Sequence, residues 1–454
     1  MKNRRIWTGM IMGLLLLITV TGCMQNPVGV DQEEWATLES AARNVLDGVL
    51  ERDYGKASQS FSETLKVLLP EAKLFADWEG LEEDLGPYEK LMGAIHKEGG
   101  DNPQVALVMR FEKGYLDMVV TLNREYDVEL VNIMPSTVVP GVTEYAVPGV
   151  VEQEVTIGEG EAALPGTLSY PEKTEGPVPV VILVHGSGPN DRDESIYTLR
   201  PFRDIAWGLG EKGIAVLRYD KRSKTYPEAM AELQLADTLT VKEEVVDDVA
   251  LVYEAAKGIT LFEVGDIYIL GHSLGGMLIP RIAAVVPDAA GYMMLAAPAR
   301  PMEDLILEQY TYILGLEDSL PAAQKDVQLA EIKKQVDNVK NLNKGDGKTV
   351  NVLLGMNAAY HLDLKGYDPA TAAKEITKPL LILQGERDYQ VTMVDFGHYQ
   401  VALGDKENVV LQSYPALNHM FIPGEGGMST PLEYYEYGRV PDEVMADIAA
   451  FVWD

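Results

Sequence analysis

The sequence has very little cysteine, because Cys23 is the only one in 454 residues. A chain with one cysteine cannot form an internal disulfide, and it cannot build a metal site from several thiolates. Histidine is also scarce, with six in the whole chain. Any chemistry that needs a histidine base must therefore use one of a few positions.

Positive charge is the second shortage. The chain holds 38 Lys and Arg against 70 Asp and Glu, which gives a formal net charge of −32. So acidic a surface repels the phosphates of nucleic acids, and we expect no polynucleotide partner. Apolar residues make up 46% of the chain, which excludes disorder, and the length suits two domains better than one.

A long hydrophobic run is also missing. Three basic residues near the N-terminus precede an apolar stretch from Ile11 to Val20, which is too short to span a bilayer. The Val-Thr-Gly-Cys that follows resembles a bacterial lipobox. The resemblance implies a signal peptide over residues 1–22, lipidation of Cys23, and an extracytoplasmic protein held to the membrane by acyl chains. An ordinary signal peptide with an incidental cysteine is the alternative. Residues 23–32 are polar and suit a short tether.

Residues 33–135 change from helical to strand-like patterns. Residues 33–61 and 81–95 carry apolar residues at helical spacing, and residues 104–135 form three short strand-like runs, typical of an antiparallel meander. This small α+β domain resembles the cone-shaped units of the ketosteroid isomerase and nuclear transport factor superfamily. Such units can hold an active site, and the meander offers the charged residues Arg110, Glu112, Asp117 and Glu129. Their alternation with apolar residues favours a solvated face, so we assign this domain to binding, spacing or packing on its neighbour.

A linker rich in proline and glycine, residues 136–149, separates this domain from a second one over residues 150–454. There, nearly continuous apolar strands alternate with amphipathic helices. The alternation predicts an α/β domain with a mainly parallel sheet covered on both faces.

The stretch ILGHSLGGML places Ser273 at the centre of a Gly-x-Ser-x-Gly pattern. The segments on either side decide whether Ser273 is a nucleophile or only a small residue in a turn. An apolar strand precedes Gly271, and a segment capable of forming a helix follows Gly275. Strand, tight turn and helix would project the serine hydroxyl above the sheet edge, near a helix N-terminus that favours negative charge. We predict that Ser273 is a nucleophile.

A serine nucleophile needs a histidine base and a carboxylate that orients it. If the base follows the acid in the chain, His398 and His419 are the candidates, and we favour His419 because His398 falls inside a predicted helix. For the acid we favour Asp388, in the polar turn after an apolar strand, over the nearby Glu386 and Asp395.

The oxyanion hole needs backbone N–H groups that are fixed before charge develops. Leu274 follows the nucleophile and supplies one. The loop beginning His185-Gly186 supplies the other, for which we favour Ser187 over Gly188. We expect His185 to support this loop and not to act as the base.

At this point the second domain resembles an α/β-hydrolase, since HGSGPNDRD, YDKRS, GHSLGG, GERD and NH occur in the order of that family. The long first motif makes it similar to bacterial carboxylesterases near the serine aminopeptidase group. One departure is SKTYPEAM after Arg222, where the family has a glycine-rich continuation. The resemblance implies that residues 300–379 form a helical cap over the site. Four residues there can line an acyl pocket or belong to the core: Met356, Tyr360, His361 and Leu364.

These observations predict a lipid-anchored serine hydrolase that cleaves small-molecule esters of small or medium acyl groups through an acyl-enzyme, with no metal and no cofactor. A peptidase or amidase and a thioesterase use the same three residues and are alternatives. A non-catalytic binding lipoprotein is the alternative from another class.

Overall fold

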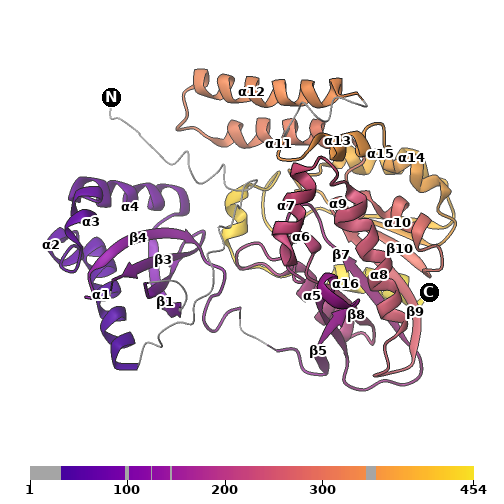
Figure 1. The fold of residues 1–454 in the computed structure, drawn as a ribbon, viewed down its shortest axis with the longest axis horizontal. Helices are drawn as coiled ribbons and strands as arrows, with labels where there is room; N and C mark the ends of the chain where they lie inside the picture. Colours follow the sequence, from indigo (N-terminus) through magenta and orange to yellow (C-terminus); the bar gives the residue numbers. More distant parts are fainter. Residues whose placement is uncertain (1–31, 98–101, 124, 144–145, 344–353) are drawn as a thin grey trace.

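A computed structural model describes residues 32–454 except 98–101, 124, 144–145 and 344–353. The expected signal peptide and Cys23 lie outside the described residues. The described chain builds a four-stranded sheet and an eight-stranded sheet, each covered by helices (Figure 1). In the described part of the chain, no helix has the length and apolar character needed to cross a membrane.

The four-stranded sheet is antiparallel in the order β1-β2-β3-β4 and carries its helices on one face. Alternate strand residues such as Leu107 and Met118 face Leu38 and Trp78 of the helices, so the period of two places one side of the sheet in the core. The elements are α1 (Gln32–Leu50), α2 (Tyr54–Ala57), α3 (Glu63–Leu68), α4 (Glu71–Leu85), β1 (Tyr88–Lys97), β2 (Gln104–Phe111), β3 (Gly114–Leu122) and β4 (Val128–Pro135).

The helix expected over residues 81–95 is wrong in its second half. Helix α4 ends at Leu85, and β1 begins at Tyr88 and pairs antiparallel with β2. The cause is local, because Gly86 adopts a positive φ of 76° and Pro87 has no N–H with which to continue the helical hydrogen bonds.

The four charged residues of the meander have different surroundings. Arg110 forms an ion pair with Glu436 of the C-terminal part, with 2.5 Å between the nitrogen and oxygen atoms. Asp117 is buried, and burial raises the pKa of its carboxyl group. Glu112 and Glu129 are exposed to solvent. The ion pair of Arg110 accords with packing between the two parts of the chain.

The eight-stranded sheet has the order β12-β11-β10-β9-β7-β8-β6-β5, in which β5, β6 and β8 pair antiparallel and the rest of the sheet is parallel. Its strands are β5 (Val150–Ile157), β6 (Leu164–Pro171), β7 (Val178–Val184), β8 (Ala215–Tyr219), β9 (Val264–His272), β10 (Gly291–Leu295), β11 (Leu380–Gly385) and β12 (Val409–Tyr414). The mainly parallel sheet expected from the sequence is therefore present.

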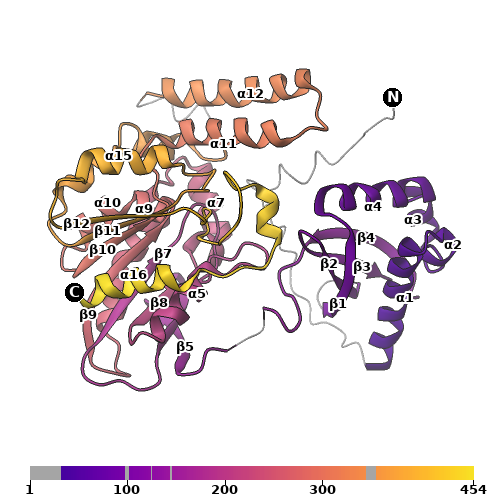
Figure 2. The same cartoon turned by 180° about the vertical axis from the view of Figure 1, so that it is seen from behind.

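Helices cover both faces of this sheet (Figures 1 and 2). Along β7, Val180 and Ile182 face one core, whereas Val181 and Leu183 face the other, which explains why the strand is apolar at every position. The first core contains residues of α8 (Asp247–Lys257), α10 (Ile279–Val285) and α15 (Met393–Leu403), and the second contains residues of α5 (Pro201–Gly210) and α16 (Asp442–Trp453). Shorter helices are α6 (Arg222–Thr225), α7 (Pro227–Leu235), a π-helical turn (Lys242–Val246), α9 (Leu274–Met277) and α14 (Pro369–Ala372).

Between β10 and β11, helices α11 (Met302–Leu316) and α12 (Ala322–Asn341) pack on each other beyond the end of the sheet, with α12 outermost (Figure 1). Helix α11 contacts the loops after β11 and β12, because Gln309 donates to the carbonyl of Gln390 at 2.9 Å and the Tyr312 hydroxyl donates to the carbonyl of Ser429 at 3.0 Å.

Helix α13 (Ala358–Leu364) packs through Tyr360 into the first core of the eight-stranded sheet. Tyr360 is only 3% exposed, and its hydroxyl donates to Glu244 at 2.7 Å. Of the two interpretations of Tyr360, acyl pocket or core, the structure favours the core.

Candidate active site

Ser273 stands in a sharp turn between β9 and α9. Its φ of 52° and ψ of −119° are unusual for a residue with a side chain. The turn requires its glycines: a Cβ on Gly271 would lie 2.3 Å from the carbonyl oxygen of Gly275, and a Cβ on Gly275 would lie 2.4 Å from that of Val184. Ser273 is partly exposed while its neighbours are buried. The turn therefore presents the hydroxyl at the edge of the sheet.

Asp388 and His419 meet in the loops after β11 and β12. Nδ1 of His419 lies 2.6 Å from Oδ2 of Asp388, and both side chains are buried. The other carboxylate oxygen, Oδ1, accepts the backbone N–H groups of Gln390 and Val391 at 2.7 and 2.9 Å. These bonds fix the carboxylate, and the carboxylate fixes the imidazole.

His272, the residue before Ser273, connects the serine turn to the loop of His419, because its Nε2 lies 2.9 Å from the carbonyl oxygen of His419. Ser273 Oγ makes no hydrogen bond to the His419 ring within the described residues. In unliganded hydrolases such bonds commonly tighten only when substrate binds.

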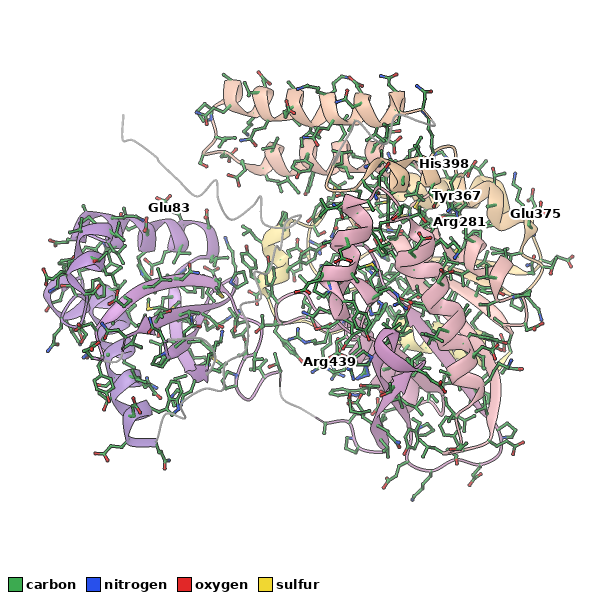
Figure 3. The ribbon with its side chains drawn as sticks, in the orientation of Figure 1. Glu83, Arg281, Tyr367, Glu375, His398 and Arg439 are labelled. Carbon is green, nitrogen blue, oxygen red and sulfur yellow. The ribbon has the colours of Figure 1, made fainter. Side chains whose placement is uncertain are left out.

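The alternative base and acids lie in other environments. His398 is exposed on α15, the helix on which Figure 3 labels it. Glu386 is exposed and accepts the Ser413 hydroxyl. Asp395 is buried, but it accepts the backbone N–H groups of Ala299 and Arg300 and pairs with the Arg300 side chain. None of these three groups contacts His419.

The loop after β7 lies directly against Ser273, since a Cβ on Gly186 would be 3.0 Å from the Ser273 Cβ. In the described part of the chain, the backbone N–H groups of Ser187 and Leu274 donate to no protein acceptor. His185 is buried between the rings of Phe202 and Tyr219, and burial lowers its pKa to about 4. A neutral, enclosed imidazole suits support of the loop.

Two buried residues at this site were not found from the sequence. Glu194 Oε1 accepts the N–H of Gly186 at 2.6 Å, and its Oε2 lies 2.9 Å from Nδ1 of His272. The latter contact has the distance of an ion pair, although the N–H is not aligned for a good hydrogen bond. The available signal was weak: His272 occupies a variable position of the Gly-x-Ser-x-Gly pattern, and Glu194 follows the first motif as an ordinary acid.

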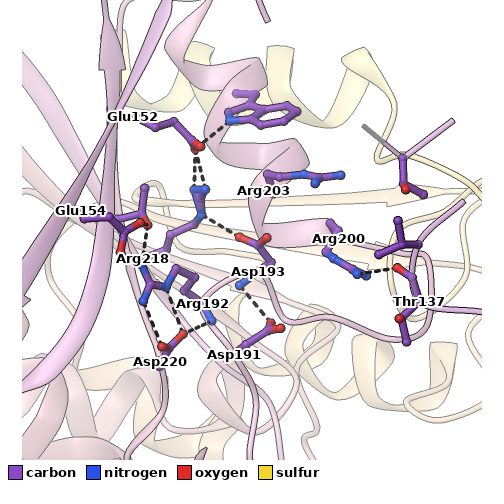
Figure 4. Close-up of a pocket in the computed structure, with 14 residues that line it drawn as sticks. Thr137, Glu152, Glu154, Asp191, Arg192, Asp193, Arg200, Arg203, Arg218 and Asp220 are labelled. Carbon is purple, nitrogen blue, oxygen red and sulfur yellow. Dashed lines mark hydrogen bonds and ion pairs between the residues drawn. The ribbon is translucent and has the colours of Figure 1, made fainter. Parts of the chain in front are cut away.

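A cavity of about 720 Å³ lies beside the end of this loop, and none of its lining residues belongs to the Ser273, Asp388 and His419 set. Figure 4 shows its ion pairs: Arg192 lies between Asp220 and Glu154, and Arg218 lies between Asp193 and Glu152. These pairs attach residues 192–193 to strands β5 and β8. We therefore interpret the cavity wall as an anchor for the loop.

Among the described residues, no group of three or more His, Asp or Glu side chains is placed to hold a metal ion.

The eight-stranded sheet, the helices on both faces and the serine turn at the strand edge define an α/β-hydrolase, and the model of the alpha/beta hydrolase family matches residues 181–425. The chain belongs to this family. A curated relative, esterase EstD of Thermotoga maritima, is 35% identical over 408 residues, which cover 88% of this chain and 92% of that protein. Similar solved structures include Est1E from Butyrivibrio proteoclasticus (19% identity, 66% of this chain, 98% of that chain, TM-score 0.42). A proline iminopeptidase from Mycobacterium smegmatis matches at 18% identity over 66% of this chain and 98% of that chain, with a TM-score of 0.42.

Proposed function

We propose that this protein is a carboxylic ester hydrolase in which Ser273, His419 and Asp388 form the catalytic triad. The observation that carries the proposal is the buried 2.6 Å contact between Asp388 and His419, in the loops that follow β11 and β12 of the sheet that also presents Ser273 in a strained turn. The relation to an esterase over most of the chain supports an ester as the substrate.

In this mechanism Ser273 Oγ attacks the ester carbonyl carbon while His419 Nε2 takes the hydroxyl proton. Asp388 holds Nδ1–H of His419 and stabilises the imidazolium that forms. The N–H groups of Ser187 and Leu274 stabilise the oxyanion. His419 then protonates the departing alkoxide, and water, activated by the same histidine, hydrolyses the acyl-enzyme.

A substrate panel tests the reaction class. We expect the purified protein to turn over p-nitrophenyl esters of short and medium acyl chains with a much higher kcat/KM than aminoacyl p-nitroanilides or acyl thioesters. The enzyme would be reassigned as a peptidase if the anilides were the better substrates, and as a thioesterase if the thioesters were.

We also propose the domain organisation expected from the sequence. Residues 33–135 form a cone-like α+β domain, residues 136–149 link it to the hydrolase domain over residues 150–454, and residues 300–379 form the cap. The contacts of α11 with the loops that follow β11 and β12 support the position of the cap.

The N-terminus is proposed to be a lipoprotein signal, with Cys23 as the lipidated residue. We expect Cys23→Ala to abolish lipid attachment, so that the protein is either released from membranes or left unprocessed, because no other sulfur can carry the thioether. Membrane fractionation and intact mass, compared between the parent and the variant, measure this. Normal processing with unchanged membrane retention in the variant would refute lipidation at Cys23.

A further inference from the structure

The peptide unit between Gly186 and Ser187 is held by its carbonyl group. That oxygen accepts the Lys221 ammonium at 2.8 Å and the Asn190 amide at 3.2 Å. A peptide unit is planar and trans, so the N–H of Ser187 points opposite to the carbonyl of Gly186. Fixing the carbonyl therefore fixes the direction of the N–H group that we assign to the oxyanion hole.

Lys221 is itself fixed in a buried position. It is only 2% exposed, and its ammonium lies 2.7 Å from the carboxylate of Glu244. Glu244 also accepts the hydroxyl of Tyr360. A buried ammonium loses much hydration free energy and keeps its charge only when it is paired, so this arrangement holds the amine at one place.

The other side of Gly186 is held by Glu194. This residue adopts a positive φ of 51° and is 3% exposed, and its carboxylate faces the N–H of Gly186 and the ring of His272. His272 in turn faces a carboxylate oxygen at Nδ1 and the carbonyl oxygen of His419 at Nε2. The carbonyl oxygen of His419 can only accept, so Nε2 carries a proton, and the carboxylate at ion-pair distance from Nδ1 favours a second proton there.

The electrostatics of the pair agree with this protonation state. Burial lowers the pKa of His272, but the Glu194 carboxylate and the His419 carbonyl more than offset that effect, and the net pKa is raised. Burial raises the pKa of Glu194, but His272 and the N–H of Gly186 reverse the shift, and the net pKa is lowered. Both shifts favour the ionised form of the pair.

We propose that Lys221 and Glu194 are positioning residues that orient the oxyanion hole by clamping Gly186 from its two sides, with His272 linking this clamp to the loop of the catalytic base. The proposal rests on the proposed function of Ser273 and of the Ser187 N–H. Neither side chain needs to touch the substrate. Their effect falls on the transition state, because an oxyanion donor acts mainly when charge develops on the carbonyl oxygen.

Two variants release the clamp. In Lys221→Met/Glu244→Gln the donor to the Gly186 carbonyl is lost, and the second change avoids leaving a buried carboxylate without its cation. In Glu194→Gln only one acceptor oxygen remains, so either the N–H of Gly186 loses its acceptor or Nδ1 of His272 loses the carboxylate oxygen that faces it. We expect each variant to lose about 10- to 100-fold in kcat with little change in KM, less than or similar to the loss of an oxyanion donor.

Two inhibitors separate this role from plain stability. In the adduct of a trifluoromethyl ketone, Ser273 Oγ bonds to the carbonyl carbon, the C=O electron pair moves to the oxygen as an oxyanion, and His419 takes the hydroxyl proton. The matching methyl ketone binds largely without an adduct. We expect the affinity for the trifluoromethyl ketone to fall in proportion to kcat/KM and the affinity for the methyl ketone to be unchanged. Asp204→Asn is the matched control, because Asp204 is a buried carboxylate that accepts a backbone N–H, that of Val440, which is not part of the clamp. It should lower the melting temperature without changing the ratio of the two affinities.

The proposal is overturned if the variants lose affinity for both ketones equally, or if they lower only the melting temperature. A separate measurement distinguishes failure of the clamp proposal from failure of the proposed function. Labelling of the parent by a fluorophosphonate, located by peptide mass, should fall on Ser273. Absence of that label overturns the triad assignment, whereas a labelled Ser273 with unaltered kcat in both variants overturns the clamp alone.

Discussion

Ser273→Ala is expected to lower kcat for p-nitrophenyl acetate by about 10⁶-fold, the size of effect seen when the nucleophile of a serine hydrolase is removed. Only Oγ is lost, and the left-handed backbone of the turn is held by the close contacts of Gly271 and Gly275. The melting temperature should therefore stay near that of the parent. Initial rates at saturating substrate, with the variant purified on unused resin to exclude parent enzyme, measure the loss.

Ser413→Ala is the matched control for this experiment. Ser413 lies on β12 of the same sheet, and its hydroxyl donates to the exposed Glu386 at 2.8 Å. We expect this variant to keep the kcat of the parent. Hydrolysis by Ser273→Ala at a rate similar to that of Ser413→Ala would show that another group attacks the ester.

The parts of this site that could be predicted are those that local sequence determines. The turn at Ser273 needs glycines at fixed positions next to a strand, and Asp388 and His419 follow two neighbouring strands in a fixed chain order. The parallel sheet was equally accessible, because strands buried on both faces are apolar at every position. Such signals lie within a few residues of the group that they identify.

Glu194 and Lys221 could not be predicted in the same way. Their roles depend on contacts with Gly186, which is 8 and 35 residues away in the chain, and an acid or a lysine in a charged segment carries no local sign of burial. The position of Tyr360 could not be predicted for a related reason, since the helical spacing of its segment indicates an apolar face but not what that face packs against. By contrast, the Gly86-Pro87 pair is a helix-stop signal that can be recognised in the sequence. The apolar residues that follow it in β1 also fit a helical spacing, so the change from helix to strand was missed.

Asp388→Asn is expected to lower kcat by about 10⁴-fold, because it fixes the wrong tautomer of His419. Oδ1 of Asp388 accepts two backbone N–H groups, from Gln390 and Val391. In asparagine only the amide oxygen can take that place, so the NH₂ group must face Nδ1 of His419. It would donate there, leaving the proton on Nε2, which then cannot accept the proton of Ser273.

Asp395→Asn provides the comparison, since Asp395 is a buried carboxylate that also accepts two backbone N–H groups but pairs with Arg300 instead of a histidine. We expect it to lower the melting temperature and leave kcat near the parent value. We expect the opposite pattern for Asp388→Asn: kcat falls steeply, whereas the melting temperature changes little because the amide oxygen still accepts the two backbone N–H groups. A difference of less than tenfold in kcat between the two variants would mean that Asp388 does not set the tautomer of the base.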